Sequence, residues 1–291
     1  MNAIIFGING QDGFYLQELL RKKDITVIGV SRSQGNWLQG TIEDKEFVTA
    51  LIVKEQPTYI FHLAANSTTS HAALYENHAT ICNGSLHILE SVYKYSPHSK
   101  VFLSGSALQF KNVGLPINEE TAFEAKSPYA VARMQSVYAA RYYRTLGLPV
   151  YVGYFFNHDS PQRLEKHISQ KIALSVQRIA SGKQEKIEIG DISVEKEYTF
   201  AGDIVQAIWI LVNQNTIYEA VIGSGKSYSI EKWLECCFGI IRKNWKDYVI
   251  EKHDFTPEYK ILVSNPQIIK GLGWEPEIGF EALAHLMIGG K

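Results

Sequence analysis

"AIIFGINGQDGFYLQELL", residues 3–20, joins an apolar, strand-like run to a helical pattern through three glycines. Gly7, Gly10 and Gly13 recur at a spacing of three, at the point where the strand pattern gives way to the helix pattern. Glycine is needed where the backbone takes positive φ or where another group comes close. A helix N-terminus presents unpaired N–H groups and a positive potential, which suit a phosphate. The stretch therefore predicts a strand–turn–helix unit that binds a dinucleotide, with a purely structural turn as the alternative.

The composition is that of an ordinary globular protein, with 45% hydrophobic and 20% charged residues in 291. A formal net charge of −1 argues against nucleic acid or a membrane surface as a partner. No apolar run approaches the roughly 18 residues of a membrane span, and no signal peptide is evident. The three cysteines form neither a disulfide framework nor a metal-ligand set, and we expect a reducing cytoplasm and no metal: Cys82, Cys236 and Cys237.

The first half of the chain alternates between strand and helix patterns, which predicts parallel βαβ units. The expected strands are 3–7, 25–30, 58–63, 100–104 and 149–155. The expected helices are 13–22, 44–55, 82–95, 128–146, 164–181, 201–214 and 229–243. We predict an α/β fold with a doubly wound parallel sheet in a Rossmann domain at 1–156, rejoined by parts of about 190–222. A smaller, mixed α/β substrate domain is expected at 157–291.

The end of the second expected strand indicates which dinucleotide is bound. An NAD site usually places Asp or Glu there to accept hydrogen bonds from the ribose hydroxyls. This chain has Ser31, Arg32 and Ser33 instead. An arginine between hydroxyls suits a 2′-phosphate through charge-assisted hydrogen bonds, so the sequence favours NADP, with NAD possible. The alternative is that Arg32 is a solvated loop charge.

A tyrosine and an arginine share one face of the expected helix 128–146. Tyr129 and Arg133 are four positions apart, and a phenol beside a fixed positive charge gives up its proton more easily. On its own such a pair is more often a surface contact. The strand "VFLSGSALQF", residues 101–110, ends in hydroxyls that include Ser106, at the edge where such sheets bind ligands. The pattern therefore predicts a proton-transfer site at Ser106, Tyr129 and Arg133.

These motifs resemble the extended short-chain dehydrogenase/reductases, the NAD-dependent epimerase/dehydratase family, along essentially the whole chain. The closest branch contains GDP-mannose 4,6-dehydratase and GDP-4-keto-6-deoxymannose reductase. The words that carry the resemblance are "GINGQDGFYLQELL", "FHLAANS" (61–67), "SPYAVAR", "FFNHDSPQR" (155–163), "GDISVEKEYTFAGDIVQAIW" (190–209) and "LGWEP" (272–276).

The resemblance implies a role for each matching residue. Tyr129 would be the acid/base at C4 of the sugar, Ser106 would hydrogen-bond the same oxygen, and Arg133 stands where the family has lysine. The cofactor would contact Gly7, Asn9, Gly10, Gln11, Asp12, Gly13, Ser31, Arg32, Ser33, Ala64, Ala65, Ser67, Tyr129, Arg133, His158 and Arg163. The substrate would contact Asn157, Lys171 and Lys196. The family pairs through the helix that carries Tyr138, Tyr142 and Tyr143, which implies a homodimer, although core packing explains these tyrosines equally well.

Three departures from the family pattern shape the functional expectation. The dehydratases carry a base two residues after Ser106, where this chain has Leu108, which moves no proton. Lys196 replaces an arginine expected to bind the diphosphate, and Thr41 replaces an acid expected near adenine. The chain is therefore expected to be an NADP(H)-dependent oxidoreductase at C4 of a nucleotide-diphosphate sugar, a GDP-linked 4-keto-6-deoxyhexose reductase. A dehydratase or epimerase with another base (Glu119, Glu120 or a histidine) and a non-catalytic NADP-binding protein are the alternatives.

One further motif resembles a phosphate-binding loop without matching it fully. "AVIGSGKS", residues 220–227, nearly spells a phosphate-binding P-loop, but Ala220 occupies the position of the first glycine. The motif also lies late in the chain and leads into a helix cap at Ser229. We therefore expect a turn that begins a helix of the substrate domain, and no nucleoside triphosphate site.

Overall fold

A seven-stranded parallel sheet forms the centre of the computed structural model, which describes residues 1–252 and 254–289. The predicted substrate domain also includes residues 253, 290 and 291, which lie outside the described residues. The strand order is β11-β6-β5-β4-β1-β2-β3, and every pairing in this sheet is parallel. The strands are β1 (Asn2–Phe6), β2 (Thr26–Ser31), β3 (Leu38–Gln39), β4 (Tyr59–His62), β5 (Lys100–Ser106), β6 (Val150–Phe155) and β11 (Glu219–Ile222).

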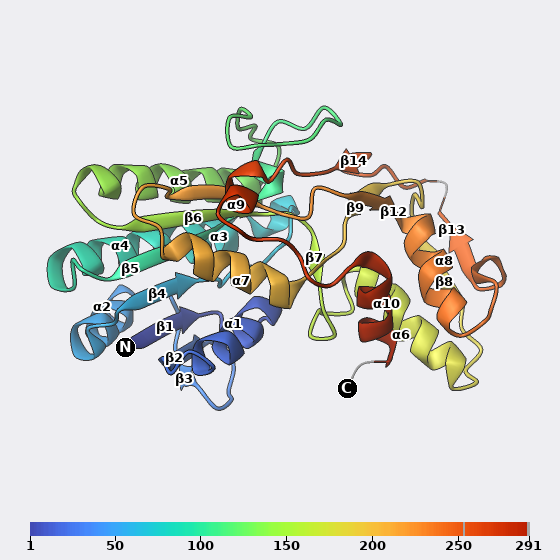
Figure 1. The fold of residues 1–291 in the computed structure, drawn as a ribbon, viewed down its shortest axis with the longest axis horizontal. Coiled ribbons are helices and arrows are strands. Elements are labelled where there is room, and N and C mark those ends of the chain that lie inside the picture. The colour runs from blue at the N-terminus through green and yellow to red at the C-terminus, as the bar shows by residue number, and fades with distance from the viewer. Residues whose placement is uncertain (253, 290–291) are drawn as a thin grey trace.

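Helices cover both faces of the sheet, as Figure 1 shows. The helices of this layer structure are α1 (Gln11–Arg21), α2 (Lys45–Glu55), α3 (Leu74–Asn77), α4 (Gly84–Tyr95), α5 (Pro128–Thr145), α7 (Ala201–Val212) and α9 (Gln267–Gly271). Alternate residues of β1 point to opposite faces: Ile4 and Phe6 pack in the core with α2, α4 and α5, whereas Ala3 and Ile5 pack with α1 and α7. Burial on both faces explains why the strand is continuously apolar. The predicted doubly wound α/β fold is confirmed.

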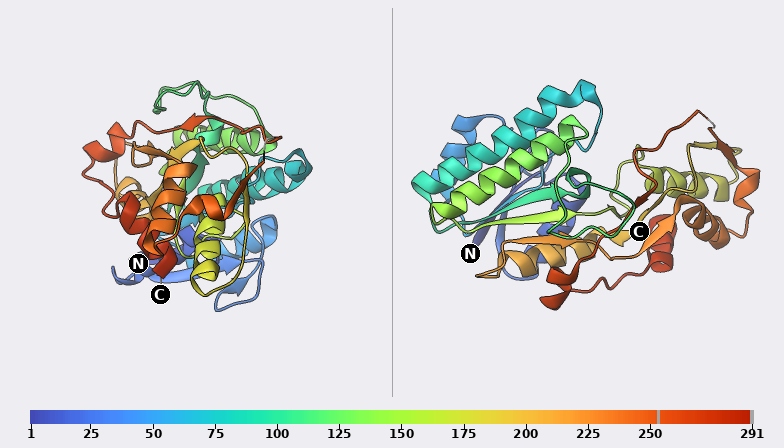
Figure 2. Two further views of the ribbon diagram at one scale, coloured as in Figure 1. Left: turned by 90° about the vertical axis from the view of Figure 1, so that its right-hand side faces the viewer. Right: turned by 90° about the horizontal axis from the view of Figure 1, so that it is seen from above.

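A smaller group of elements lies beside the sheet (Figure 2). Helices α6 (Ile168–Ala180), α8 (Ile230–Ile240) and α10 (Phe280–Gly289) share a separate core around the buried Trp233. The short strands form three sheets: β10 (Thr199–Phe200) with β7 (His158–Asp159); β12 (Ser227–Ser229) and β14 (Ile261–Leu262) on either side of β9 (Glu195–Glu197); β13 (Val249–Glu251) with β8 (Ile187–Ile189). The chain leaves the large sheet after β6 and returns to it with α7 and β11. We propose that the two domains divide along this path.

Several expected boundaries differ from the structure. The helix expected from residue 164 begins only at Ile168, because the preceding residues form a turn in which Arg163 contacts His167 and Asp159. The helix expected at 82–95 begins at Gly84, after a π-helical segment at His78–Asn83. Short 3-10 turns occupy His71–Ala73, Ala107–Gln109 and Trp245–Asp247. Within the described residues, no helix is both long enough and apolar enough to cross a membrane.

Candidate active site

A cavity of about 900 Å³ opens at the carboxyl ends of β1, β2, β4, β5 and β6. Parallel sheets bind ligands at this edge, where the strand order reverses between β4 and β1. The cavity brings together most of the residues predicted from the sequence: Gly7, Asn9, Gly10, Gln11, Asp12, Gly13, Ser31, Arg32, Ser33, Ala64, Ala65, Ser67, Ser106, Tyr129, Arg133, Asn157, His158 and Arg163. Of the predicted residues, Lys171 and Lys196 do not line it.

The glycine loop between β1 and α1 uses its glycines for different reasons. Gly7 has a φ of +94°, and a Cβ there would lie 2.7 Å from the backbone nitrogen of Ala64. At Gly13 a Cβ would lie 2.4 Å from the carbonyl oxygen of Gly7, so this glycine lets α1 begin directly against the turn. Gly10 has ordinary backbone angles and precedes α1 at the cavity wall. A Cβ there would meet only the carbonyl oxygen of Gly7, at 3.4 Å, and Gly10 stands directly before the helix N-terminus, where an anion would bind.

Ser106, Tyr129 and Arg133 line the cavity from β5 and α5. Ser106 ends β5, and its hydroxyl accepts a hydrogen bond from the backbone N–H of Leu108 at 3.2 Å. Tyr129 lies in the first turn of α5, which Ser127 caps. The guanidinium carbon of Arg133 lies 5.1 Å from the centre of the Tyr129 ring, so the predicted juxtaposition of phenol and positive charge is present.

The Arg133 guanidinium is also tied to β5. Its Nη1 donates to the carbonyl oxygen of Ser104 and, at 2.8 Å, to the hydroxyl oxygen of the same residue. Arg133 is buried, and its Nε has no hydrogen-bond partner among the described residues. The charge is therefore fixed beside Tyr129, while part of the guanidinium is already engaged by the strand.

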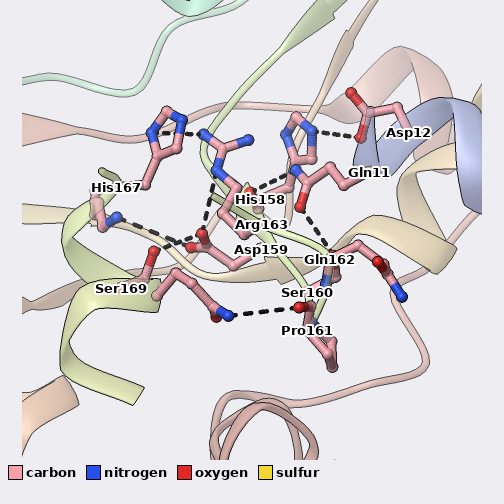
Figure 3. A network of polar contacts seen from close by, with 12 residues as sticks. Gln11, Asp12, His158, Asp159, Ser160, Pro161, Gln162, Arg163, His167 and Ser169 are labelled. Carbon is pink, nitrogen blue, oxygen red and sulfur yellow. Dashed lines mark hydrogen bonds and ion pairs between the residues drawn. The ribbon is translucent and has the colours of Figure 1, made fainter. Parts of the chain in front are cut away.

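An ion pair links α1 to β7 at the cavity wall (Figure 3). His158 Nε2 lies 2.9 Å from Asp12 Oδ1, and Nδ1 lies 2.7 Å from the carbonyl oxygen of Phe156. Both ring nitrogens face acceptors, which favours the charged imidazolium. Burial opposes this charge, but the Asp12 carboxylate and its hydrogen bond outweigh burial and raise the pKa of His158.

The Q-D-G motif (11–13) and the N-H-D-S-P motif (157–161) form one structural unit. Gln11 Nε2 donates to the carbonyl oxygen of His158 at 3.2 Å, and Gln11 Oε1 accepts from the hydroxyl of Ser160 at 2.9 Å. With the Asp12–His158 pair, these contacts clamp the start of α1 to the segment that follows β6 (Figure 3). Two motifs that lie far apart in the sequence therefore support each other at one wall of the cavity.

A second polar cluster lies behind this wall. Asp159 accepts a short hydrogen bond from the Ser169 hydroxyl, and its carboxylate lies 3.7 Å from Arg163 Nε and 3.9 Å from Lys196 Nζ. Burial acts to raise the pKa of Asp159, but the charges of Lys196 and Arg163 and the bond from Ser169 lower it. Lys196 is thus buried with Asp159. Lys171 is also turned away from the cavity, because its Nζ donates to the carbonyl oxygen of Glu188 at 2.7 Å.

Two acidic residues that sequence reasoning missed lie beside Arg32, which follows β2. Arg32 Nη2 lies 3.3 Å from Glu76 Oε1, and Arg32 Nη1 lies 3.7 Å from Glu43 Oε1. Both glutamates line the cavity. Glu43 precedes α2 and Glu76 belongs to α3, so neither falls at the strand end where an acid is normally sought. Arg32 is paired with these two glutamates, and its side chain is 61% exposed, so the solvated loop charge stays open as the alternative.

Leu108 lines the cavity beside Tyr129, with which it shares an apolar cluster. A carboxylate that the sequence did not reveal, Glu258, lies in the same region, since it and Leu108 line both the main cavity and an adjoining one of about 260 Å³. Burial raises the pKa of Glu258. Glu119, which the sequence placed among alternative bases, instead accepts a hydrogen bond from the backbone N–H of Val221 at 2.6 Å and does not line the cavity.

The P-loop-like turn is engaged by the protein itself. The backbone N–H groups of Ser224 and Gly225 donate to the buried carboxylate of Glu197, at 2.5 Å and 3.3 Å. Glu197 also accepts the backbone N–H of Ser264 at 2.6 Å. An internal carboxylate thus occupies the donors that would hold a phosphate in a P-loop.

The donors along the cavity fit an elongated dinucleotide cofactor. The cavity runs from the open N-terminus of α1 and the hydroxyls and guanidinium at the end of β2 to the tyrosine on α5. A phosphate group suits the helix N-terminus, and polar groups at the end of the second strand suit an adenosine ribose. Among the described residues, no group of three or more His, Cys, Asp or Glu side chains is placed to hold a metal ion.

Comparisons with known proteins agree with this architecture. The family model for GDP-mannose 4,6 dehydratase matches residues 4–287. "GDP-mannose 4,6 dehydratase 1" of Arabidopsis thaliana is 30% identical over 98% of this chain and 88% of the relative, and the human "GDP-mannose 4,6 dehydratase" is 28% identical over 98% and 90%.

Solved structures share the fold along the whole chain. The Thermotoga maritima UDP-glucose 4-epimerase, solved with UDP-glucose, matches with a TM-score of 0.90 and 23% identity over 100% of this chain and 98% of its own. RMD from Pseudomonas aeruginosa, solved with NADPH, matches with a TM-score of 0.85 and 20% identity over 99% and 96%. Because the family model covers nearly the whole chain and the Arabidopsis relative is 30% identical, this chain belongs to the GDP-mannose 4,6 dehydratase family.

Proposed function

We propose that the chain is a nicotinamide-dependent oxidoreductase that acts at C4 of a nucleotide-diphosphate sugar, with reduction of a GDP-linked 4-keto-6-deoxyhexose as its reaction. The observation that supports this proposal is that Ser106, Tyr129 and Arg133 lie in one cavity with the glycine loop, while Leu108 occupies the adjacent wall. Family membership supports the substrate class.

The proposed roles follow from the positions of the side chains. Tyr129 donates its hydroxyl proton to the C4 carbonyl oxygen, and the Ser106 hydroxyl hydrogen-bonds the same atom. Arg133, fixed on Ser104, places a positive charge beside the phenol and stabilises the phenolate that remains. The bound nicotinamide would supply the hydride. Asn157 would contact the sugar; its Oδ1 accepts a hydrogen bond from the Tyr259 hydroxyl at 3.3 Å.

We assign NADP as the preferred cofactor, because Ser31, Arg32 and Ser33 present hydroxyls and a guanidinium at the end of β2. The diphosphate of the cofactor would lie at the N-terminus of α1. The Asp12 carboxylate stands close to that position, and its pairing with His158 offsets part of the negative charge that an anion would meet there.

The test is the reduction of GDP-4-keto-6-deoxy sugars by NADPH. The reaction is measured as the loss of NADPH absorbance. Removal of the proton donor in Tyr129→Phe should lower kcat roughly 10²–10⁴-fold while NADPH still binds. Tyr75→Phe, an exposed tyrosine outside the cavity, is the control and should leave kcat unchanged. Cofactor binding without turnover on any 4-keto sugar nucleotide would favour the non-catalytic alternative.

A second candidate function is 4,6-dehydration, and the observation that favours it is Glu258. This carboxylate lies at the cavity wall with Leu108 and could abstract the proton that Leu108 cannot. The same preparation, incubated with GDP-mannose and NADP, separates the two functions by product mass. A product lighter by one water, formed by the wild type and not by Glu258→Gln, would establish the dehydratase.

A further inference from the structure

A guanidinium lies between two carboxylates at the end of the cavity formed by β2. Arg32 contacts Glu76 at 3.3 Å and Glu43 at 3.7 Å, and its side chain is 61% exposed. Two negative charges therefore surround one positive charge where a 2′-phosphate would approach. At an exposed position such ion pairs are individually weak, so Arg32 can exchange partners, but the two carboxylates remain in place.

Neighbouring side chains hold the two carboxylates at the cavity wall. Glu76 Oε2 accepts a hydrogen bond from Asn66 Nδ2 at 2.8 Å, and this bond, together with Arg32, lowers the pKa of Glu76. Glu43 Oε1 accepts from the Thr80 hydroxyl at 2.6 Å. Asn66 follows β4 and Thr80 lies in the π-helical segment, and both line the cavity. The acids are thus part of the built wall.

Arginine and carboxylates act on the two cofactors in opposite directions. A 2′-phosphate gains from Arg32 but is repelled by carboxylates that cannot move away. A ribose with a free 2′-hydroxyl donates hydrogen bonds to a carboxylate, which is how acids at this position favour NAD. Each glutamate retains acceptor capacity for such a bond beyond its present partner.

We propose that Glu43 and Glu76 are specificity-determining residues that offset Arg32 and limit the preference of this site for a 2′-phosphorylated cofactor, so that NADH and NADPH both bind. This inference rests on the nicotinamide cofactor of the proposed function, and it does not depend on the sugar substrate or on the reaction. Arg32 supplies the attraction for the 2′-phosphate, and the two glutamates set how much of it remains.

The test measures equilibrium binding of NADPH and NADH to the purified protein by nicotinamide fluorescence, without any sugar. Glu76→Gln keeps an oxygen for Asn66 and removes the charge. This variant should bind NADPH about tenfold tighter and NADH equally or more weakly. Glu43→Gln should act in the same direction, and Arg32→Ala in the opposite one. Competition by 2′,5′-ADP and by 5′-AMP should reproduce the shift, because these fragments differ only in the phosphate at issue.

The control is Glu46→Gln, which removes the same charge from an exposed position in the first turn of α2, outside the cavity. Its ratio of NADPH to NADH affinity should equal that of the wild type. An unchanged ratio in both Glu43→Gln and Glu76→Gln overturns the proposal. An equal shift in Glu46→Gln also overturns it, since bulk charge would then suffice. If neither cofactor binds the wild type, this inference and the cofactor assignment both fall, whereas binding without sugar turnover refutes only the proposed reaction.

Discussion

Among single residues, the Asp12–His158 pair ties the stability of the fold to proton binding. Folding raises the pKa of His158 above 6.5, because the Asp12 carboxylate outweighs burial. Burial acts to raise the pKa of Asp12, but His158, with smaller contributions from Arg163 and Arg133, outweighs burial and lowers it below 3.8. The stabilisation that comes from the raised pKa of His158 is complete below pH 6.5, and it is lost as pH rises through the pKa of His158 in the folded state. The stabilisation that comes from the lowered pKa of Asp12 is present above pH 3.8, and it is lost as pH falls through the pKa of Asp12 in the folded state.

The pair should therefore stabilise the protein most between pH 3.8 and 6.5. In that window Asp12→Asn should lower the free energy of unfolding by roughly 1.5–3 kcal/mol, the contribution of a hydrogen bond between charged groups. The difference from wild type should shrink as pH rises above the raised pKa of His158. Urea denaturation across this range measures it, with the exposed Asp24→Asn as control. A difference that does not vary with pH would show that the pair binds no linked proton.

At the scale of elements, the close contact between α1 and the glycine loop depends on Gly13. A methyl group there would lie 2.4 Å from the carbonyl oxygen of Gly7, a backbone atom that cannot move without displacing β1. Gly13→Ala should therefore cost about 1–3 kcal/mol of unfolding free energy, as overpacking does. At Gly10 the corresponding distance is 3.4 Å and φ is −79°, so Gly10→Ala should cost less than about 1 kcal/mol. Equal losses in the two variants would contradict this account.

The elements that the sequence predicted well are those with a local signal. Periodicity and glycine spacing place β1 and α1, and the cavity at the end of these strands follows from their parallel order. The counterions of Arg32 could not be predicted in the same way. Glu43 and Glu76 approach it only after α2 and α3 fold against the sheet, and no spacing in the sequence records that approach.

The prediction of the candidate site was limited because side chains also contact residues that lie far away in the sequence. The sequence placed Lys171 and Lys196 at the substrate, but both side chains contact the protein: Lys171 donates to the backbone carbonyl oxygen of Glu188, and the buried Lys196 lies with Asp159. A buried ammonium takes the nearest carboxylate because an unpaired charge is costly away from water. Glu258 lies in a region of short strands with weak periodicity, so its place at the cavity that Leu108 also lines became visible only in three dimensions.

For the molecule as a whole, α4 and α5 lie side by side on one face of the sheet (Figure 2). Both helices carry exposed apolar side chains. Tyr138 and Tyr142 are 60% and 59% exposed, whereas Tyr143 is buried in the core, so core packing accounts for only one of the three tyrosines. On α4, Leu86 and Tyr93 are also exposed. Apolar rows on adjacent helices are typical of an interface, and an isologous contact between two copies would cover both helices at once.

We therefore predict a homodimer that joins through α4 and α5. The double variant Tyr138→Glu with Tyr142→Glu places two negative charges on each copy within the apolar row, and repulsion across the symmetric interface should halve the mass found by light scattering. Ile250→Glu, at an exposed apolar position on β13, is the control and should keep the mass of the wild type. A monomeric wild type would exclude the dimer. A dimer that persists in the double variant would move the interface away from these helices. Helix α5 also carries Tyr129 and Arg133. If the dimer joins through α5, the monomeric variant should therefore have a lower kcat, because the first turn of the helix becomes less rigid. Its affinity for the cofactor, which is set at the end of β2, should stay unchanged.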